Sequence, residues 1–132
     1  MKICRLKMIK ESLFGDENKE IEYFISEYHE NETDLHVRYR EENQGATTTI
    51  VANAEQIKII RSGEVTSNIP LSLNERQTVV IDSPYGQMYM ESKALVIVKK
   101  DNVIHVEYQL LQEQQVIGHY KITWQLLKEE LA

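Results

Sequence analysis

Apolar and polar residues alternate along most of this chain, and the alternation has the period of two that is typical of β-strands. The longest such stretch lies near the C-terminus. Its apolar face consists of Val116, Gly118, Tyr120, Ile122, Trp124 and Leu126. A strand of this length spans about 36 Å at ~3.3 Å per residue, so we expect it to twist and coil around a core.

Shorter strand-like stretches cover most of the remaining chain; most of them alternate, whereas 47–51 is β-branched throughout and 94–98 is apolar on both faces. They lie at 2–10, 20–26, 35–40, 47–51, 65–69, 78–82, 87–91, 94–98 and 104–110. Short polar connections separate them, among them Gly15-Asp16-Glu17-Asn18 and Asn43-Gln44-Gly45. The tail 127–132 is expected to form one helical turn or to fray. The pattern therefore predicts about nine or ten strands and almost no helix.

The strand predicted at 20–26 has an ambiguous pattern. Ile21, Tyr23 and Ile25 alternate with polar residues and are the predicted apolar face. Phe24 lies on the opposite face of this strand, which should then be exposed to solvent. We therefore expect Ile21, Tyr23 and Ile25 to face the core.

The turn Ser83-Pro84-Tyr85-Gly86 separates two of the predicted strands. Proline presets φ near −65°, which suits the first central position of a tight turn. Glycine adopts positive φ nearby without strain because it has no Cβ. The two strands should therefore form a hairpin.

The segment 53–63 allows two interpretations. An asparagine at its start and Gly63 just past its end could cap a short helix. With a period of two, Ile57, Ile59 and Arg61 instead form one face of a strand. We favour the strand, because isoleucine is frequent here and strand-like segments flank it on both sides.

An antiparallel meander of so many strands has to protect its apolar face and its edges. Closure into a barrel covers both. A two-sheet sandwich would also bury the apolar face, but its Greek-key crossings usually need longer connections than this chain has. We predict one all-β domain, 1–132, built as a closed antiparallel barrel of about 8 to 10 strands.

Composition narrows the function classes. The chain has 132 residues, of which 42% are hydrophobic and 27% charged, and its net charge is −6. This charge argues against nucleic-acid partners and against anionic membrane surfaces. The longest apolar run, Ala94–Val98, is far too short for a membrane-spanning helix. The N-terminus lacks the uninterrupted apolar core of a signal peptide, and Cys4 is the single cysteine, so we expect a cytoplasmic protein.

Three short motifs resemble the YwiB-like family of uncharacterised bacterial proteins. They are Arg61-Ser62-Gly63-Glu64-Val65, Ser83-Pro84-Tyr85-Gly86 and Glu107-Tyr108-Gln109-Leu110. The family turn usually reads Thr-Pro-Tyr-Gly after an aromatic residue, whereas this chain has Ser83 and, near the aromatic position, Ile81. The resemblance implies a lipocalin-like (calycin-type) β-barrel. It implies no activity, substrate or catalytic residue.

A barrel of this size can enclose side chains or one small ligand. The candidate ligand-binding residues, all on predicted inward faces, are Arg61, Tyr108, Tyr120, Trp124, Met88 and Met90. A guanidinium beside two phenols could bind a carboxylate or phosphate. For each of these residues we favour a structural role over ligand binding. Arg61 would pair with Glu64 or another acid, and the two methionines would fill gaps in the core.

Histidines and acids do not form a recognisable metal site. His29, Glu30, Glu32, Asp34 and His36 cluster without established ligand spacing. The turn would have to fold back to join His29 and His36, so we interpret the segment as a solvated hairpin tip. His105 and His119 are expected on the outer faces of adjacent strands, as surface residues or as a cross-strand pair.

Enzymatic activity is the weakest of the function classes. Cys4 is on a predicted core face, and no serine lies in a Gly-x-Ser-x-Gly elbow. No phosphate loop or dinucleotide fingerprint is present, and we expect no cofactor and no metal. Two functions remain: binding of a small amphipathic or anionic ligand inside the barrel, or a structural and interaction role through the surface or a homodimer interface.

Overall fold

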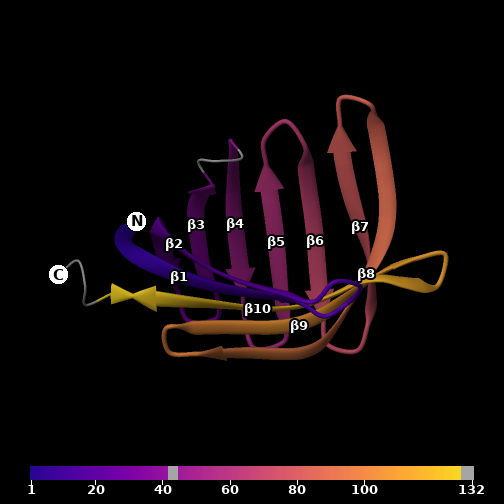
Figure 1. The fold of residues 1–132 in the computed structure, drawn as a ribbon. Coiled ribbons are helices and arrows are strands. Elements are labelled where there is room, and N and C mark those ends of the chain that lie inside the picture. The colour runs from indigo at the N-terminus through magenta and orange to yellow at the C-terminus, as the bar shows by residue number, and fades with distance from the viewer. Residues whose placement is uncertain (42–44, 129–132) are drawn as a thin grey trace.

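The computed structural model describes residues 1–41 and 45–128, which form ten antiparallel strands (Figure 1). The strands are β1 (Lys2–Ser12), β2 (Asn18–Glu30), β3 (Leu35–Glu41), β4 (Ala46–Ala52), β5 (Gln56–Ser62), β6 (Thr66–Ser72), β7 (Arg76–Ser83), β8 (Gly86–Lys100), β9 (Val103–Gln112) and β10 (Gln115–Leu127). The segment with two interpretations is therefore a strand, β5, as predicted.

The ten strands close into a barrel in which each strand pairs with its neighbours along the chain. The closing contact joins β10 to β1, from Arg5 opposite Leu127 to Ser12 opposite Tyr120. The predicted closed antiparallel barrel is thus confirmed. Closure encloses the inner face of the sheet, from which most of the core side chains come, and this is the physical reason for which it was expected.

The barrel wall bends sharply within β8. In Figure 1, β3 to β7 lie alongside one another with alternating directions, and β1, β9 and β10 cross them. The first part of β8 pairs with β7, and the part from Glu91 onward pairs with β9. A β-bulge between Ala94 and Val96 lies in this second ladder. Bulges bend and twist a strand, so this one helps β8 to turn from the group of β3 to β7 into the group of β1, β9 and β10.

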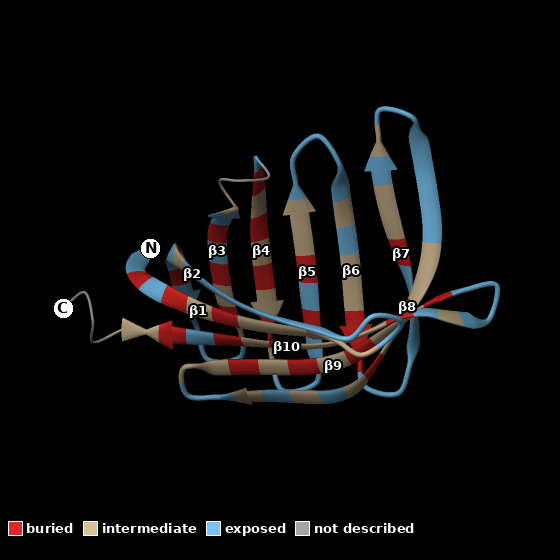
Figure 2. Cartoon of the chain, in the orientation of Figure 1, coloured by how far each residue is buried: buried red, intermediate tan, exposed pale blue. Residues whose placement is uncertain are grey.

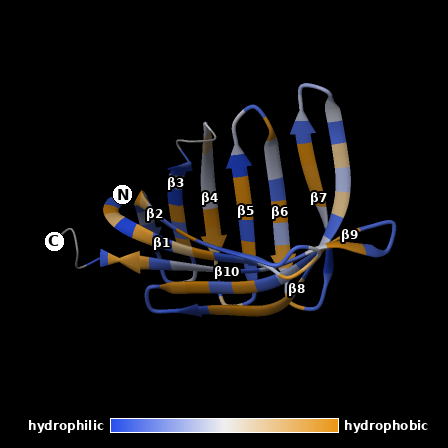
Figure 3. Cartoon of the chain, viewed as in Figure 1, coloured by the Kyte–Doolittle hydropathy of each residue, from blue (hydrophilic) through white to orange (hydrophobic). Residues whose placement is uncertain are grey.

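The core lies between the two groups of strands, and buried positions recur along each strand (Figure 2). Figure 3 shows the same alternation as hydrophobic and hydrophilic bands. The largest fully buried side chains include Trp124, Leu6, Leu35, Ile50, Ile57, Leu71 and Ile104. They come from both groups of strands, so packing of the two groups against each other stabilises the barrel.

The prediction for the buried face of β2 is wrong. Ile21, Tyr23 and Ile25 lie on the outer surface, where they are 52%, 49% and 63% exposed. Phe24 packs against the core instead, because the ladder with β1 places it opposite the fully buried Leu6. Since alternate residues of a strand point to opposite faces, this one pairing fixes the orientation of every β2 side chain.

One predicted turn and the C-terminal tail lie at the ends of the described ranges. The turn Asn43-Gln44-Gly45 and the tail 127–132 lie partly outside them; β10 ends at Leu127. Within 1–41 and 45–128, no helix has the length and apolar character that crossing a membrane requires.

Candidate functional site

One row of inward-facing residues crosses the barrel wall near its rim. Successive ladders pair the members of this row, which are Tyr39 (β3), Thr48 (β4), Arg61 (β5), Ser67 (β6), Ile81 (β7) and Met88 (β8). Paired residues in a sheet share a face, so these side chains form a continuous inner strip. The strip changes from polar on β4 to β6 to apolar on β7 and β8.

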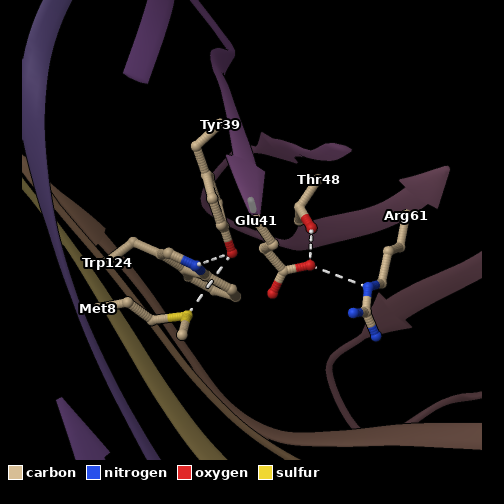
Figure 4. A network of polar contacts seen from close by, with 6 residues as sticks. All are labelled: Met8, Tyr39, Glu41, Thr48, Arg61 and Trp124. Carbon is tan, nitrogen blue, oxygen red and sulfur yellow. Dashed lines mark hydrogen bonds and ion pairs between the residues drawn. The ribbon is translucent and has the colours of Figure 1, made fainter. Parts of the chain in front are cut away.

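Arg61 forms an ion pair at the polar end of this row. Its Nε lies 2.9 Å from the Oε2 of Glu41, and the Thr48 hydroxyl donates a hydrogen bond of 3.1 Å to the same oxygen (Figure 4). The Arg61 side chain is 39% exposed, whereas that of Glu41 is 19% exposed. Arg61 thus pairs with an acid, as we favoured from the sequence, and Glu41 is an acid of this pairing. The pair lies between the core and the solvent.

Trp124 lies beneath this pair in the centre of the barrel. Its indole Nε1 donates a hydrogen bond of 3.2 Å to the Tyr39 hydroxyl, which in turn lies 3.6 Å from the Met8 sulfur (Figure 4). Trp124 is 2% exposed. Burial raises the pKa of Tyr39 to about 12, although the hydrogen bond from Trp124 acts in the opposite direction. Tyr39 is therefore a neutral phenol at physiological pH.

Tyr108 and Tyr120 lie side by side on β9 and β10, with ring centroids 5.5 Å apart. Tyr108 is only 4% exposed, and burial followed by the proximity of Tyr120 raises its pKa. The Lys10 ammonium lies 5.3 Å from the centroid of the more accessible Tyr120 ring. Tyr108 thus belongs to the buried core and leaves little surface for a ligand to contact.

Met88 and Met90 occupy the apolar end of the strip. Met88 is opposite Ile81 and 50% exposed, so it does not fill a gap in the core as we favoured from the sequence. Met90 is opposite the fully buried Val79, one row deeper. The two methionines therefore lie at different depths on the same inward face of β8.

A hollow of about 240 Å³ adjoins Arg61 at the rim. Its lining residues are Ala46, Arg61, Gly63, Glu64, Val65 and Ser67. Glycine at position 63 allows the backbone to approach the Gly45 carbonyl closely, because a Cβ at this position would lie only 3.2 Å from that oxygen. Of the six candidate residues, the structure thus places Arg61 at a hollow, Met88 at the rim, and Tyr108 and Trp124 in the filled interior.

The histidine-containing segment at the β2–β3 connection is an exposed hairpin tip, as interpreted from the sequence, whereas the alternative of a cross-strand pair of His105 and His119 is wrong. The hairpin of β2 and β3 does bring His29 opposite His36, with ring centroids 6.2 Å apart. No group of three or more metal-ligating side chains occurs in the described part of the chain. His105 and His119 do not pair with each other: His105 lies 2.8 Å from the Thr123 hydroxyl, and His119 lies 2.8 Å from the Glu107 carboxylate.

Sequence reasoning missed Glu41, Thr48 and Tyr39 as members of the site. The signal was present for Glu41, because Leu35, Val37, Tyr39 and Glu41 continue one alternation. A carboxylate on an otherwise apolar strand face needs a cation or hydrogen-bond donor close to it, because burying an unpaired charge is costly. That partner, Arg61, could not be identified from the sequence because it lies two strands away.

Comparison with known proteins agrees with this architecture. A family described as Domain of unknown function (DUF1934) matches residues 8–123. The chain belongs to this family. Its fold is similar to that in the crystal structure of the ywiB protein from Bacillus subtilis, with a TM-score of 0.73, 14% sequence identity, and coverage of 94% of this chain and 92% of that one. The resemblance to YwiB-like proteins is thereby confirmed. Among curated proteins, none matches this chain.

Proposed function

We propose that this DUF1934 protein binds a small amphipathic ligand with an anionic head group at the barrel rim. The observation that carries the proposal is the inner strip from Thr48 to Met88, which is polar around Arg61 and apolar at Ile81 and Met88. A hollow of about 240 Å³ lies at the Arg61 end. Head group and apolar chain would thus find complementary surfaces on one continuous face.

The head group binds at Arg61. A guanidinium forms strong, charge-assisted hydrogen bonds with a carboxylate or phosphate. Glu41 holds Arg61 in place in the absence of ligand, at a distance of 2.9 Å. Because both are anions, Glu41 and the ligand compete for the same cation. Neutralising Glu41 should therefore strengthen binding, whereas removing the charge of Arg61 should abolish the preference for anions.

The apolar chain lies along Ile81 and Met88 at the rim, because the deeper interior is filled. Trp124 and Tyr108 are 2% and 4% exposed, so they form the floor of the site and leave no room for a chain between them. Methionine is flexible and polarisable, and it can adapt to a chain of variable shape. The half-exposed Met88 is thus the apolar contact nearest to solvent.

Isothermal titration calorimetry with three matched probes tests this proposal: decanoate, decyl phosphate and decanol. We expect the two anions to bind and decanol to bind about tenfold more weakly, as loss of a charge-assisted contact implies. Arg61→Gln should remove this difference, and Glu41→Gln should strengthen binding of both anions. Lys58→Gln, at an exposed position of the same strand, β5, is the matched control. Absence of binding, or equal affinity of all three probes for the native chain, would contradict the proposal.

A further inference from the structure

The outer face of β1 and β2 exposes a group of large apolar side chains. Ile3, Ile21, Tyr23 and Ile25 are 63%, 52%, 49% and 63% exposed. The ladder between the two strands brings them together: Ile3 is opposite Glu27, and Ile25 and Tyr23 are the next outward-facing residues of β2. Arg5 lies among them, opposite Ile25 and with its guanidinium 4.6 Å from the centroid of the Tyr23 ring. Exposed apolar side chains gathered on one face mark interaction sites more often than isolated ones do.

A groove with a volume of about 280 Å³ lies at the edge of this surface, between β2 and β3. It is lined by Ile3, Ile25, Ser26, Glu27, Arg38, Tyr39, Arg40 and Thr47. Among the described residues, the ladder between β2 and β3 begins only at Ser26 opposite Tyr39 and continues to Glu30 opposite Leu35. The part of β2 that precedes Ser26 therefore has no ladder partner on the β3 side within this part of the chain.

The charge around this groove is opposite to that of the whole protein. Arg38 and Arg40 are exposed, and within 1–41 and 45–128 neither forms an ion pair. Lys7 lies on the same outer face, opposite Tyr23, and Glu27 is the one acidic residue that lines the groove. The chain as a whole has a net charge of −6. Two unpaired cations beside an apolar groove on such a chain favour an acidic partner.

We propose that the groove binds an extended acidic segment of a partner protein, which lies over the outer face of β2 and β3. An extended peptide directs alternate side chains to its two sides. Apolar residues on one side therefore contact Ile3 and Ile25, while acidic residues on the other side pair with Arg38 and Arg40.

Other occupants fit the groove less well. A second copy of this chain would bring Arg38 and Arg40 against the same cations of its partner in a symmetric contact. Nucleic acid would match the arginines, but the groove lacks a continuous basic track. Its exposed apolar residues are the aliphatic Ile3 and Ile25, whereas the aromatic Tyr39 is only 4% exposed. The aliphatic and cationic components together match a peptide with alternating acidic and apolar residues.

Fluorescence polarisation with a labelled peptide of alternating glutamate and leucine residues tests this inference. We expect saturable binding, and we expect the double substitution Arg38→Gln with Arg40→Gln to weaken it by about tenfold, as loss of two interface charges implies. Ile25→Lys is the second variant: it keeps the cations but removes the apolar contact, and it should also weaken binding. Lys93→Gln with Lys100→Gln removes the same charge on β8 and serves as the matched control.

Three results would overturn the inference. The first is equal binding of a peptide of alternating lysine and leucine residues. The second is tighter binding of a single-stranded oligonucleotide that also depends on Arg38 and Arg40, which would make the groove a nucleic-acid site. The third is a dimer of the native chain in light scattering that Ile25→Lys converts to a monomer, which would make this face a homodimer interface.

Discussion

The indole of Trp124 donates a hydrogen bond to the hydroxyl of Tyr39 at 3.2 Å, and this bond joins β10 to β3 through the centre of the barrel. The two residues are 85 positions apart in the sequence. The Tyr39 ring also packs against that of Phe24, with centroids 4.6 Å apart. One tyrosine thus connects the last strand of the barrel with β2 and β3, directly beneath the ion pair of Arg61 and Glu41.

Tyr39→Phe should destabilise the protein by about 1–3 kcal/mol, because it leaves the buried N–H of Trp124 without an acceptor. Urea-induced unfolding, followed by tryptophan fluorescence, measures this change. Tyr85→Phe removes the phenol hydroxyl of a turn residue that is itself 98% exposed, and it is the matched control. A stability equal to that of the native chain would show that the hydrogen bond contributes nothing.

Alkaline pH should destabilise the barrel through Tyr39 and Tyr108. Burial raises the pKa of both phenols above the ordinary value of 10.0, that of Tyr39 to about 12. The folded state therefore keeps protons that the unfolded chain loses. The stabilisation is complete below about pH 10 and is lost as the pH rises through the folded-state pKa, at about 1.4 kcal/mol per pH unit for each phenol.

Urea unfolding between about pH 8 and about pH 11 measures this dependence. Tyr39→Phe removes one of the two phenols whose pKa is raised, so the loss of stability per pH unit above about pH 10 should fall to about half. Tyr85→Phe should retain the full dependence. An unchanged slope in Tyr39→Phe would contradict the assignment.

Gly118→Ala should disturb the packing of Tyr120. A Cβ at Gly118 would lie 2.7 Å from the Cε2 of Tyr120, which is too close for unchanged packing. The ring would have to shift from its contact with Tyr108, at a cost of about 1–3 kcal/mol. A double-mutant cycle with Tyr120→Ser measures the coupling. In the Tyr120→Ser background the alanine should cost much less, and equal costs in both backgrounds would show that the ring is not the cause.

Adjacent residues of β2 should respond very differently to truncation. Phe24 packs against the core and against Tyr39, so Phe24→Ser should destabilise the protein by about 2–4 kcal/mol. Ile25 is 63% exposed, and Ile25→Ser should change the stability by less than about 0.5 kcal/mol. Thermal unfolding of both variants decides which face of β2 is inside. The reverse order of effects would restore the orientation expected from the sequence.

The sequence predicted some elements well because their signals are unambiguous. In β10, large apolar residues occupy one face and polar residues the other, so its inward face with Trp124 follows from local periodicity. In β2 both faces carry large apolar residues, among them Phe24 and Ile25. Local periodicity could not choose between them. The ladder with β1, which places Phe24 opposite Leu6, made the choice.

The candidate site likewise has features that the sequence predicted and features that it could not predict. The inward position of Arg61 followed from its alternation with Ile57 and Ile59. Its partner Glu41 did not, because the two residues meet through β4, where Thr48 lies between them. The exposure of Met88 was also unpredictable, since the pattern fixes which face a residue occupies but not how far along the barrel the filled core extends.

The sequence by itself determined where the strands and turns lie, because strand period and turn geometry depend on a few neighbouring residues. It also implied closure, since a long meander with one apolar face has few other ways to cover that face and its edges. Only the tertiary structure decided which residues meet across strands: Glu41 with Arg61, Tyr39 with Trp124, and Phe24 with the core. Such pairings depend on the register of all ten strands at once, and that register is set by the joint packing of side chains from distant parts of the chain.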